Sequence, residues 1–217
     1  KVIGDYQFYN CPRLTGVSVP EDIEDMGQGA FGDCISLVEI YIPFVGNHEY
    51  TTDSKESLFG YIFGEEKELV DKIETEYNTL VDAKYTELYE AKWQELYDEY
   101  YNSNPDGLPA SKLPASSSNY ADTEIAKLEA SLRAEAESLY TKDYSALSGL
   151  IKTTQRYSDD KSSEFIFYLP ASLKNVHLTR DTTVGYGAFM DCRNLETITL
   201  PDTLTTIKAY AFDGCES

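Results

Sequence analysis

Short runs of apolar residues recur near both ends of the chain with the spacing Leu-x-x-Ile/Val-x-Ile/Val/Leu. In each run apolar and polar side chains alternate, which places the apolar ones on one face of a short strand. A proline follows three of the four runs and ends the strand, because it removes a backbone hydrogen-bond donor. The pattern predicts four strands, at residues 14–19, 37–42, 173–178 and 195–200.

The strands belong to a longer repeat with a period of 23 residues. The shared positions recur in pairs: Phe8, Cys11 and Leu14 with Phe31, Cys34 and Leu37, and Phe189 and Cys192 with Phe212 and Cys215. One such unit cannot bury its apolar face alone, whereas stacked units cover one another. A residue that tolerates a left-handed backbone precedes each cysteine, which predicts a recurring tight turn at Asn10, Asp33, Asp191 and Gly214. The fold class predicted is therefore an α/β-type repeat solenoid with a ladder of short parallel strands.

This repeat resembles the BspA-like leucine-rich repeat, a family of surface and secreted proteins of anaerobic bacteria and some protozoan parasites. The residues that carry the resemblance are Ile23, Met26, Ala30, Phe31, Cys34, Leu37, Ile40, Ile42 and Pro43, matched by Leu204, Ile207, Ala211, Phe212 and Cys215. The resemblance covers residues 1–43 and roughly 169–217. It implies a leucine-rich-repeat fold, an extracellular or cell-surface location, and a role in adhesion or binding.

A long polar segment interrupts the repeats. Residues 65–101 contain no Gly or Pro and carry apolar residues at helical spacing. A Pro-, Gly- and Ser-rich stretch follows, and a second helix is predicted to begin at Asp122 or Thr123, each a good N-cap. We expect repeats at 1–43, a connecting loop at 44–64, an antiparallel helical hairpin at 65–160 with its loop at about 102–121, and repeats at 161–217. Two helices packed flat on the solenoid are the alternative.

The charge balance excludes two classes of partner. The chain has 38 acidic against 18 basic residues, a net charge of −20. A nucleic-acid binder needs clustered Lys and Arg, and an anionic membrane would repel this chain. No stretch approaches the roughly 20 apolar residues that span a bilayer, so no membrane insertion is expected. Both ends fall inside a repeat, and an open repeat end exposes apolar residues, so we expect flanking repeats of the same chain.

The residues that could support catalysis form no recognisable constellation. The four cysteines lack CxxC spacing, so we favour a buried column of thiols over a disulfide pair or a thiolate metal site. His48 and His177 are expected to be exposed to solvent, without the third group that a catalytic base requires. No calcium-loop pattern and no phosphate-binding glycine loop is present. The sequence therefore predicts no enzyme activity, no metal site and no cofactor.

Binding is the function that the pattern favours. The outward strand positions mix polar and aromatic side chains: Ser18, Glu39, Tyr41, His177, Thr197 and Thr199. Six tyrosines in residues 65–101 exceed what one helical seam can bury, so we expect exposed tyrosines near the loop, at Tyr100, Tyr101 and Tyr120. The acidity of this segment favours a partner that is basic or rich in hydrogen-bond donors. We predict a non-catalytic module of a larger surface protein that recognises a protein or glycan; a structural spacer is the alternative.

Overall fold

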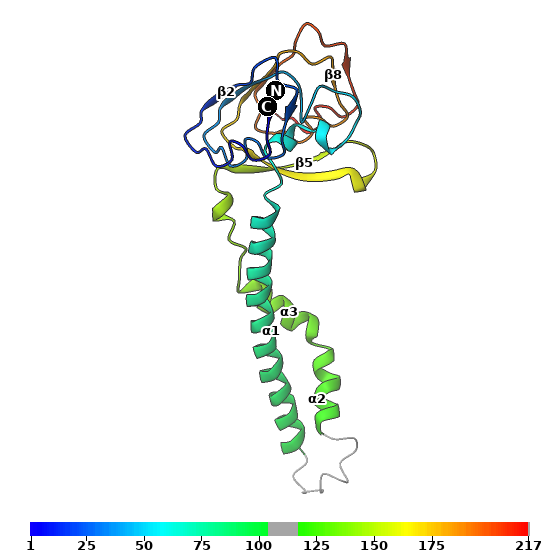
Figure 1. Cartoon of the computed structure of the whole chain (residues 1–217). Coiled ribbons are helices and arrows are strands. Elements are labelled where there is room, and N and C mark those ends of the chain that lie inside the picture. Colours follow the sequence, from blue (N-terminus) through cyan, green and yellow to red (C-terminus); the bar gives the residue numbers. More distant parts are fainter. Residues whose placement is uncertain (104–116, 217) are drawn as a thin grey trace. The chain divides into compact units, whose positions relative to one another are not determined.

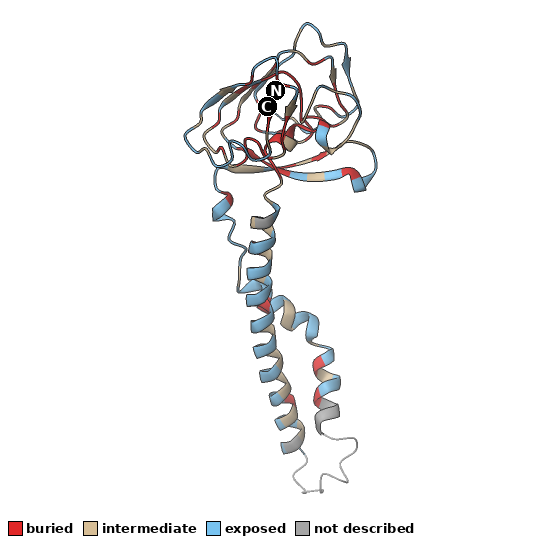
Figure 2. Cartoon of the chain, in the orientation of Figure 1, coloured by how far each residue is buried: buried red, intermediate tan, exposed pale blue. Residues whose placement is uncertain are grey.

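The chain forms two compact units in the computed structural model, Lys1–Lys67 together with Leu147–Ser217, and Glu68–Ala146 (Figure 1). The structure describes residues 1–103 and 117–216, without the side chains of Glu68, Tyr101 and residues 117–120. The first unit contains the repeats and the second contains the helices. Figure 2 shows buried positions throughout the repeat unit and only isolated ones along the helices, so the two units differ in the size of their cores.

The four predicted strands are present and pair side by side. They are β2 (Gly16–Ser18), β4 (Glu39–Ile42), β7 (Asn175–Leu178) and β9 (Thr197–Thr199), and they form one parallel sheet in the order β2-β4-β7-β9. Apolar side chains of each run turn inward: Ile40 and Val176, for example, are fully buried. The sheet pairs β4 directly with β7, so the ladder is continuous across the long insertion.

Two smaller parallel sheets also follow the repeat. β1 (Val2–Ile3) pairs with β3 (Asp25–Met26), and β8 (Thr183–Val184) pairs with β10 (Thr206–Ile207). The paired residues are 23 positions apart in both sheets, so in these two sheets the sequence period is also the hydrogen-bonding register.

The predicted left-handed turns are confirmed. The residues before the four cysteines all have positive φ: Asn10 (53°), Asp33 (54°), Asp191 (59°) and Gly214 (75°). A second left-handed position, which the repeat pattern did not indicate, lies four residues earlier in each unit, at Tyr6, Gly29, Gly187 and Tyr210. Each unit therefore changes direction at two fixed points.

Residues 44–64, expected to be a connecting loop, instead contribute to the core. This segment contains the 3-10 helices η1 (Lys55–Ser57) and η2 (Phe59–Ile62). The backbone N–H of Phe31 donates to the carbonyl of Ile62 (2.8 Å), and that of Phe59 donates to the carbonyl of Ala188 (2.8 Å). The ring of Phe59 lies 4.7 Å from that of Phe189, between centroids. Phe59 thus takes the place of the repeat's phenylalanine in the interrupted unit.

The hairpin insertion predicted at 65–160 is too long at its C-terminal end. β5 (Leu150–Arg156) and β6 (Glu164–Pro170) form an antiparallel pair in the repeat unit, joined through the 3-10 helix η4 (Lys161–Ser163). The fully buried side chains of β5, Thr153 and Gln155, are polar, whereas the apolar Ile151 on the same face is only partly buried. A strand whose fully buried residues are polar has no alternating apolar pattern, which is why the sequence did not indicate it.

The helical unit is built on α1 (Lys67–Asn102), close to the predicted range. The second predicted helix begins earlier than Asp122 and is divided in two, α2 (Ser117–Ala126) and α3 (Glu129–Ser138), followed by η3 (Ser145–Leu147). The division falls at residues 127–128, whose N–H groups bond to carbonyls three residues back and so tighten the turn. Most of the loop expected at about 102–121 lies outside the residues described.

Contacts between α1 and the returning chain run in opposite sequence order. Asp122, Arg133 and Lys142 contact Trp93, Asp82 and Glu74, respectively, so the two segments are antiparallel. The apolar core of this unit is small: Leu96, Ala121 and Ile125, with Tyr89, Trp93, Tyr97 and Leu132 packed against them. None of the helices described is apolar over a length that could cross a membrane.

Candidate functional site

The six predicted residues of the strand face lie together on the four-stranded sheet. Pairing of the strands aligns Ser18, Tyr41, His177 and Thr199 in one row, and Glu39 and Thr197 in the adjacent row with Gly16 and Asn175. Neighbouring strands are about 4.8 Å apart, so the first row extends over about 14 Å. We call these six residues, Ser18, Glu39, Tyr41, His177, Thr197 and Thr199, the strand face.

His177 connects three strands of this face. Its Nε2 lies 3.1 Å from Oε1 of Glu39, and its Nδ1 lies 3.0 Å from Oγ1 of Thr199. Because a carboxylate can only accept, Nε2 carries the proton, and in the neutral ring Nδ1 accepts from the threonine hydroxyl. The imidazole also stacks on Tyr41, with ring centroids 4.2 Å apart. These three contacts fix the orientation of the ring.

Both histidines are less exposed than predicted. The His177 side chain retains 20% of its accessible surface, because Tyr41 covers one of its faces. His48 is half-buried, with Nδ1 2.7 Å from Oδ1 of Asn47 and Nε2 3.2 Å from Oγ1 of Thr51. The expectation of two solvent-exposed histidines was therefore wrong, since each has polar partners that hold it against the surface.

Tyr41 presents an apolar ring and a hydroxyl together. It is 37% exposed. Partial burial, followed by the negative charge of Glu39, raises the pKa of Tyr41 above its usual value, so the phenol remains protonated at neutral pH. Ser18, Thr197 and Thr199 are also exposed. The strand face thus offers hydroxyl groups, a carboxylate and an aromatic ring.

The cysteines lie inside the repeat unit as free thiols. Cys34 and Cys192 are fully buried, while Cys11 and Cys215 are half-buried. Gln155 lies against Cys192, and its Nε2 donates to Sγ over 3.3 Å. Burial raises the pKa of the Cys34 thiol to about 11 and that of Cys192 well above its usual value, which makes both poor nucleophiles.

The structure describes the side chain of only one of the three tyrosines predicted to be exposed near the loop. Tyr100 is half-buried, whereas the side chains of Tyr101 and Tyr120 lie outside the residues described. In the part of the chain that the structure describes, no group of three or more His, Cys, Asp or Glu side chains is placed to hold a metal ion.

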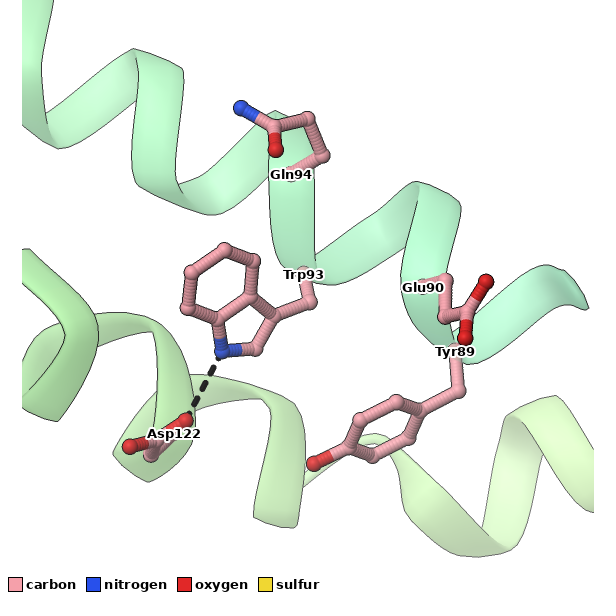
Figure 3. Close-up of a pocket in the computed structure, with 5 residues that line it drawn as sticks. All are labelled: Tyr89, Glu90, Trp93, Gln94 and Asp122. Atoms are coloured by element: carbon pink, nitrogen blue, oxygen red, sulfur yellow. Dashed lines mark hydrogen bonds between the residues drawn. The ribbon is translucent and has the colours of Figure 1, made fainter. Parts of the chain in front are cut away.

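The helical unit contains a pocket that the sequence pattern did not single out. It has a volume of about 380 Å³ and is lined by Tyr89, Glu90, Trp93, Gln94 and Asp122 (Figure 3). The indole Nε1 of Trp93 donates to Oδ1 of Asp122 over 2.8 Å. The sequence could have indicated Trp93 as the one tryptophan of the chain, but not its contact with a residue 29 positions away.

The repeated units and the parallel ladder define a leucine-rich-repeat protein. The family model described as the BspA type leucine rich repeat region matches six copies, over residues 1–59 and 150–217. The chain belongs to this family, as the sequence pattern indicated. The matched range includes β5 and part of the segment expected to be a connecting loop, in agreement with the structure. Neither a curated protein nor a solved structure matches the chain.

Proposed function

We propose that the chain is a non-catalytic binding module that recognises a protein or a glycan through its strand face. We propose that the module is a leucine-rich-repeat solenoid with an inserted antiparallel helical hairpin. It would be part of a larger protein at the cell surface or outside the cell. The observation that carries the proposal is the His177 contact set, which holds Glu39, Tyr41 and Thr199 in one arrangement.

Fixed side chains reduce the cost of binding. A ligand that meets an already oriented group does not have to immobilise it, which saves about 0.5–1.5 kcal/mol for each flexible side chain. Stacking and two hydrogen bonds orient His177, and His177 in turn restrains Glu39 and Thr199. The strand face is therefore a preorganised surface.

The chemistry of this surface fits ligands that are rich in hydroxyl or amide groups. Serine and threonine hydroxyls both donate and accept, and Glu39 accepts only. The exposed ring of Tyr41 adds apolar contact area beside them. Sugar rings and polypeptide backbones combine the same two features, polar groups and apolar faces.

A binding comparison on defined surfaces tests this proposal. The purified chain is applied to a printed glycan array and to immobilised bovine fetuin before and after enzymatic removal of its glycans. We expect binding to at least one of these probes. The triple variant Tyr41→Ala, His177→Ala and Thr199→Ala should bind about tenfold more weakly, because it loses the stacked pair of rings and three hydrogen-bonding groups.

The matched control is Thr206→Ala. Thr206 is exposed and lies on β10, in a different sheet from the strand face. This variant should bind as the parent does. If the folded triple variant bound every probe as well as the parent, the strand face would have no recognition role, and a structural spacer would be the better interpretation.

A further inference from the structure

Helix α1 carries a recurring pair of side chains, an acidic residue followed three positions later by an aromatic one. The described pairs are Glu74–Tyr77, Asp82–Tyr85 and Glu90–Trp93, spaced eight residues apart. Residues three apart lie on the same side of a helix, so each carboxylate is adjacent to an aromatic ring. This combination attracts cations, through the carboxylate charge and through the negative face of the ring.

The returning chain places a cation on each of the first two pairs. Nζ of Lys142 lies 5.2 Å from the ring centroid of Tyr77 and also contacts the carboxylate of Glu74. The guanidinium of Arg133 lies 5.8 Å from the ring centroid of Tyr85 and contacts the carboxylate of Asp82. In both cases one cation binds the acid and covers the ring.

The third pair is different. Opposite Glu90 and Trp93 the returning chain supplies Asp122, a second carboxylate, and a pocket of about 380 Å³ lies between the two segments (Figure 3). No cationic side chain is among the described residues that line this pocket. Lys92 and Lys127, which lie nearby in the sequence, are paired with Glu95 (2.7 Å) and Glu124 (2.6 Å).

The lining of this pocket is held in place before any ligand arrives. The hydrogen bond from the Trp93 indole to Asp122 fixes the ring and the carboxylate relative to each other. Tyr97 stacks on Trp93, with ring centroids 5.3 Å apart and an angle of 19° between the ring planes. Glu90 is exposed, so a ligand can reach its carboxylate from solution.

We propose that this pocket binds an arginine or lysine side chain of a partner protein. The ligand would occupy the place that Lys142 and Arg133 take at the other two pairs, against an indole instead of a phenol ring. Tryptophan is the strongest of the aromatic side chains in such contacts, and a guanidinium can stack on it while it donates to carboxylates. The pocket volume lies within the range of small-ligand sites, about 300–1,000 Å³. The site involves the helical unit alone and does not depend on the strand face.

The fluorescence of Trp93 provides a direct test, because it is the only tryptophan in the chain. The full chain is titrated with the peptide acetyl-Arg-Gly-Arg-amide and with the same peptide in which citrulline, an uncharged isostere, replaces arginine. We expect a saturable change in fluorescence with the arginine peptide, and affinity for the citrulline peptide lower by about fivefold or more. Spermidine, as a free polyamine, should bind more weakly than the arginine peptide.

Charge-matched variants separate the pocket from the general acidity of the chain. Glu90→Gln and Asp122→Asn each remove one charge from the pocket and should weaken arginine-peptide binding about threefold or more. Glu99→Gln removes the same charge from an exposed position of α1 that does not line the pocket, and should leave affinity nearly unchanged at about 0.15 M salt. Circular dichroism verifies that each variant retains its helices.

Three results would overturn the proposal. One is equal affinity for the arginine and citrulline peptides, which would exclude recognition of charge. The second is an equal loss of affinity in Glu99→Gln and Glu90→Gln, which would reduce the effect to general electrostatics. The third is tighter binding of spermidine than of the peptide, which would assign the pocket to free polyamines.

Discussion

The imidazole of His177 lies almost parallel to the ring of Tyr41, with centroids 4.2 Å apart and 12° between the planes. The two residues are direct neighbours in the register of β4 and β7, although 135 residues separate them in the sequence between positions 41 and 177. The same imidazole contacts Glu39 and Thr199. One side chain thus links β4, β7 and β9 on their outward face.

This stacking predicts energetic coupling between the two residues. Cross-strand pairs of this kind contribute about 0.2–1 kcal/mol, and aromatic pairs about 0.5–1.5 kcal/mol. In a double-mutant cycle with Tyr41→Ala and His177→Ala, we expect a coupling of about 0.5–1 kcal/mol in the free energy of unfolding. Urea unfolding followed by circular dichroism measures it. Strictly additive effects would show that the rings do not interact.

The left-handed positions of the repeat predict that alanine substitution affects stability very differently at two glycines. Gly187 has φ of +59°, and a Cβ there would lie 2.0 Å from the carbonyl oxygen of Arg156. Gly187→Ala should therefore destabilise the repeat unit by about 2 kcal/mol or more, from strain and overlap together. In Gly16→Ala the nearest atom lies 3.8 Å away, so stability should change by less than about 0.5 kcal/mol. Comparable unfolding midpoints in urea for the two variants would contradict this expectation.

The burial of the thiols predicts their reactivity. Cys34 and Cys192 are fully buried and their pKa values are raised. Iodoacetamide should therefore modify neither thiol in the native protein at pH 8. The half-buried Cys11 and Cys215 should react faster, and all four should react in concentrated urea. Peptide mass spectrometry identifies the modified residues. Rapid native labelling of Cys34 or Cys192, or recovery of a disulfide, would disagree with this structure.

The contacts of Glu74 predict a pH dependence in the helical unit. Hydrogen bonds from Lys142 and Tyr144 hold the pKa of Glu74 below its usual 4.5. A carboxyl group with a lowered pKa stabilises the folded state above its unfolded pKa, and that stabilisation is lost as pH falls through the folded pKa. Glu74→Gln should therefore lower the melting temperature of the helices at pH 7.

The same linkage predicts how the effect of Glu74→Gln changes with pH. The difference in melting temperature between this variant and the parent should narrow below pH 4.5, because the Glu74 carboxylate of the parent becomes protonated. Thermal unfolding followed at 222 nm at pH 7 and at acidic pH provides the comparison. Glu99→Gln, which alters an exposed carboxylate of the same helix, is the control. A difference that stayed constant across this range would mean that Glu74 titrates alike in the folded and unfolded states.

The 23-residue period by itself determines which residues of neighbouring repeats pair. Backbone hydrogen bonds between stacked units pair equivalent positions, so the period predicts the register of Tyr41 with Ser18. His177 and Thr199 also occupy equivalent positions, but they are 22 residues apart because this spacing is one residue short of the period. The left-handed turns at Asn10 and Asp33 follow from residue type, which acts locally in each unit. The composition of the strand face was therefore readable from alternation alone, and the family assignment followed from the same pattern.

Only the tertiary structure decided what completes the interrupted unit and what the helices enclose. Phe59 fills a core position from outside the repeat period, and β5 buries Thr153 and Gln155, so neither carries a periodic apolar signal. The pocket at Trp93 depends on which residue of the returning chain lies opposite that ring, and the contact with Asp122 spans 29 positions of sequence. Such contacts join residues that are distant in the sequence and share no period, so their chemistry emerges only when the chain is folded.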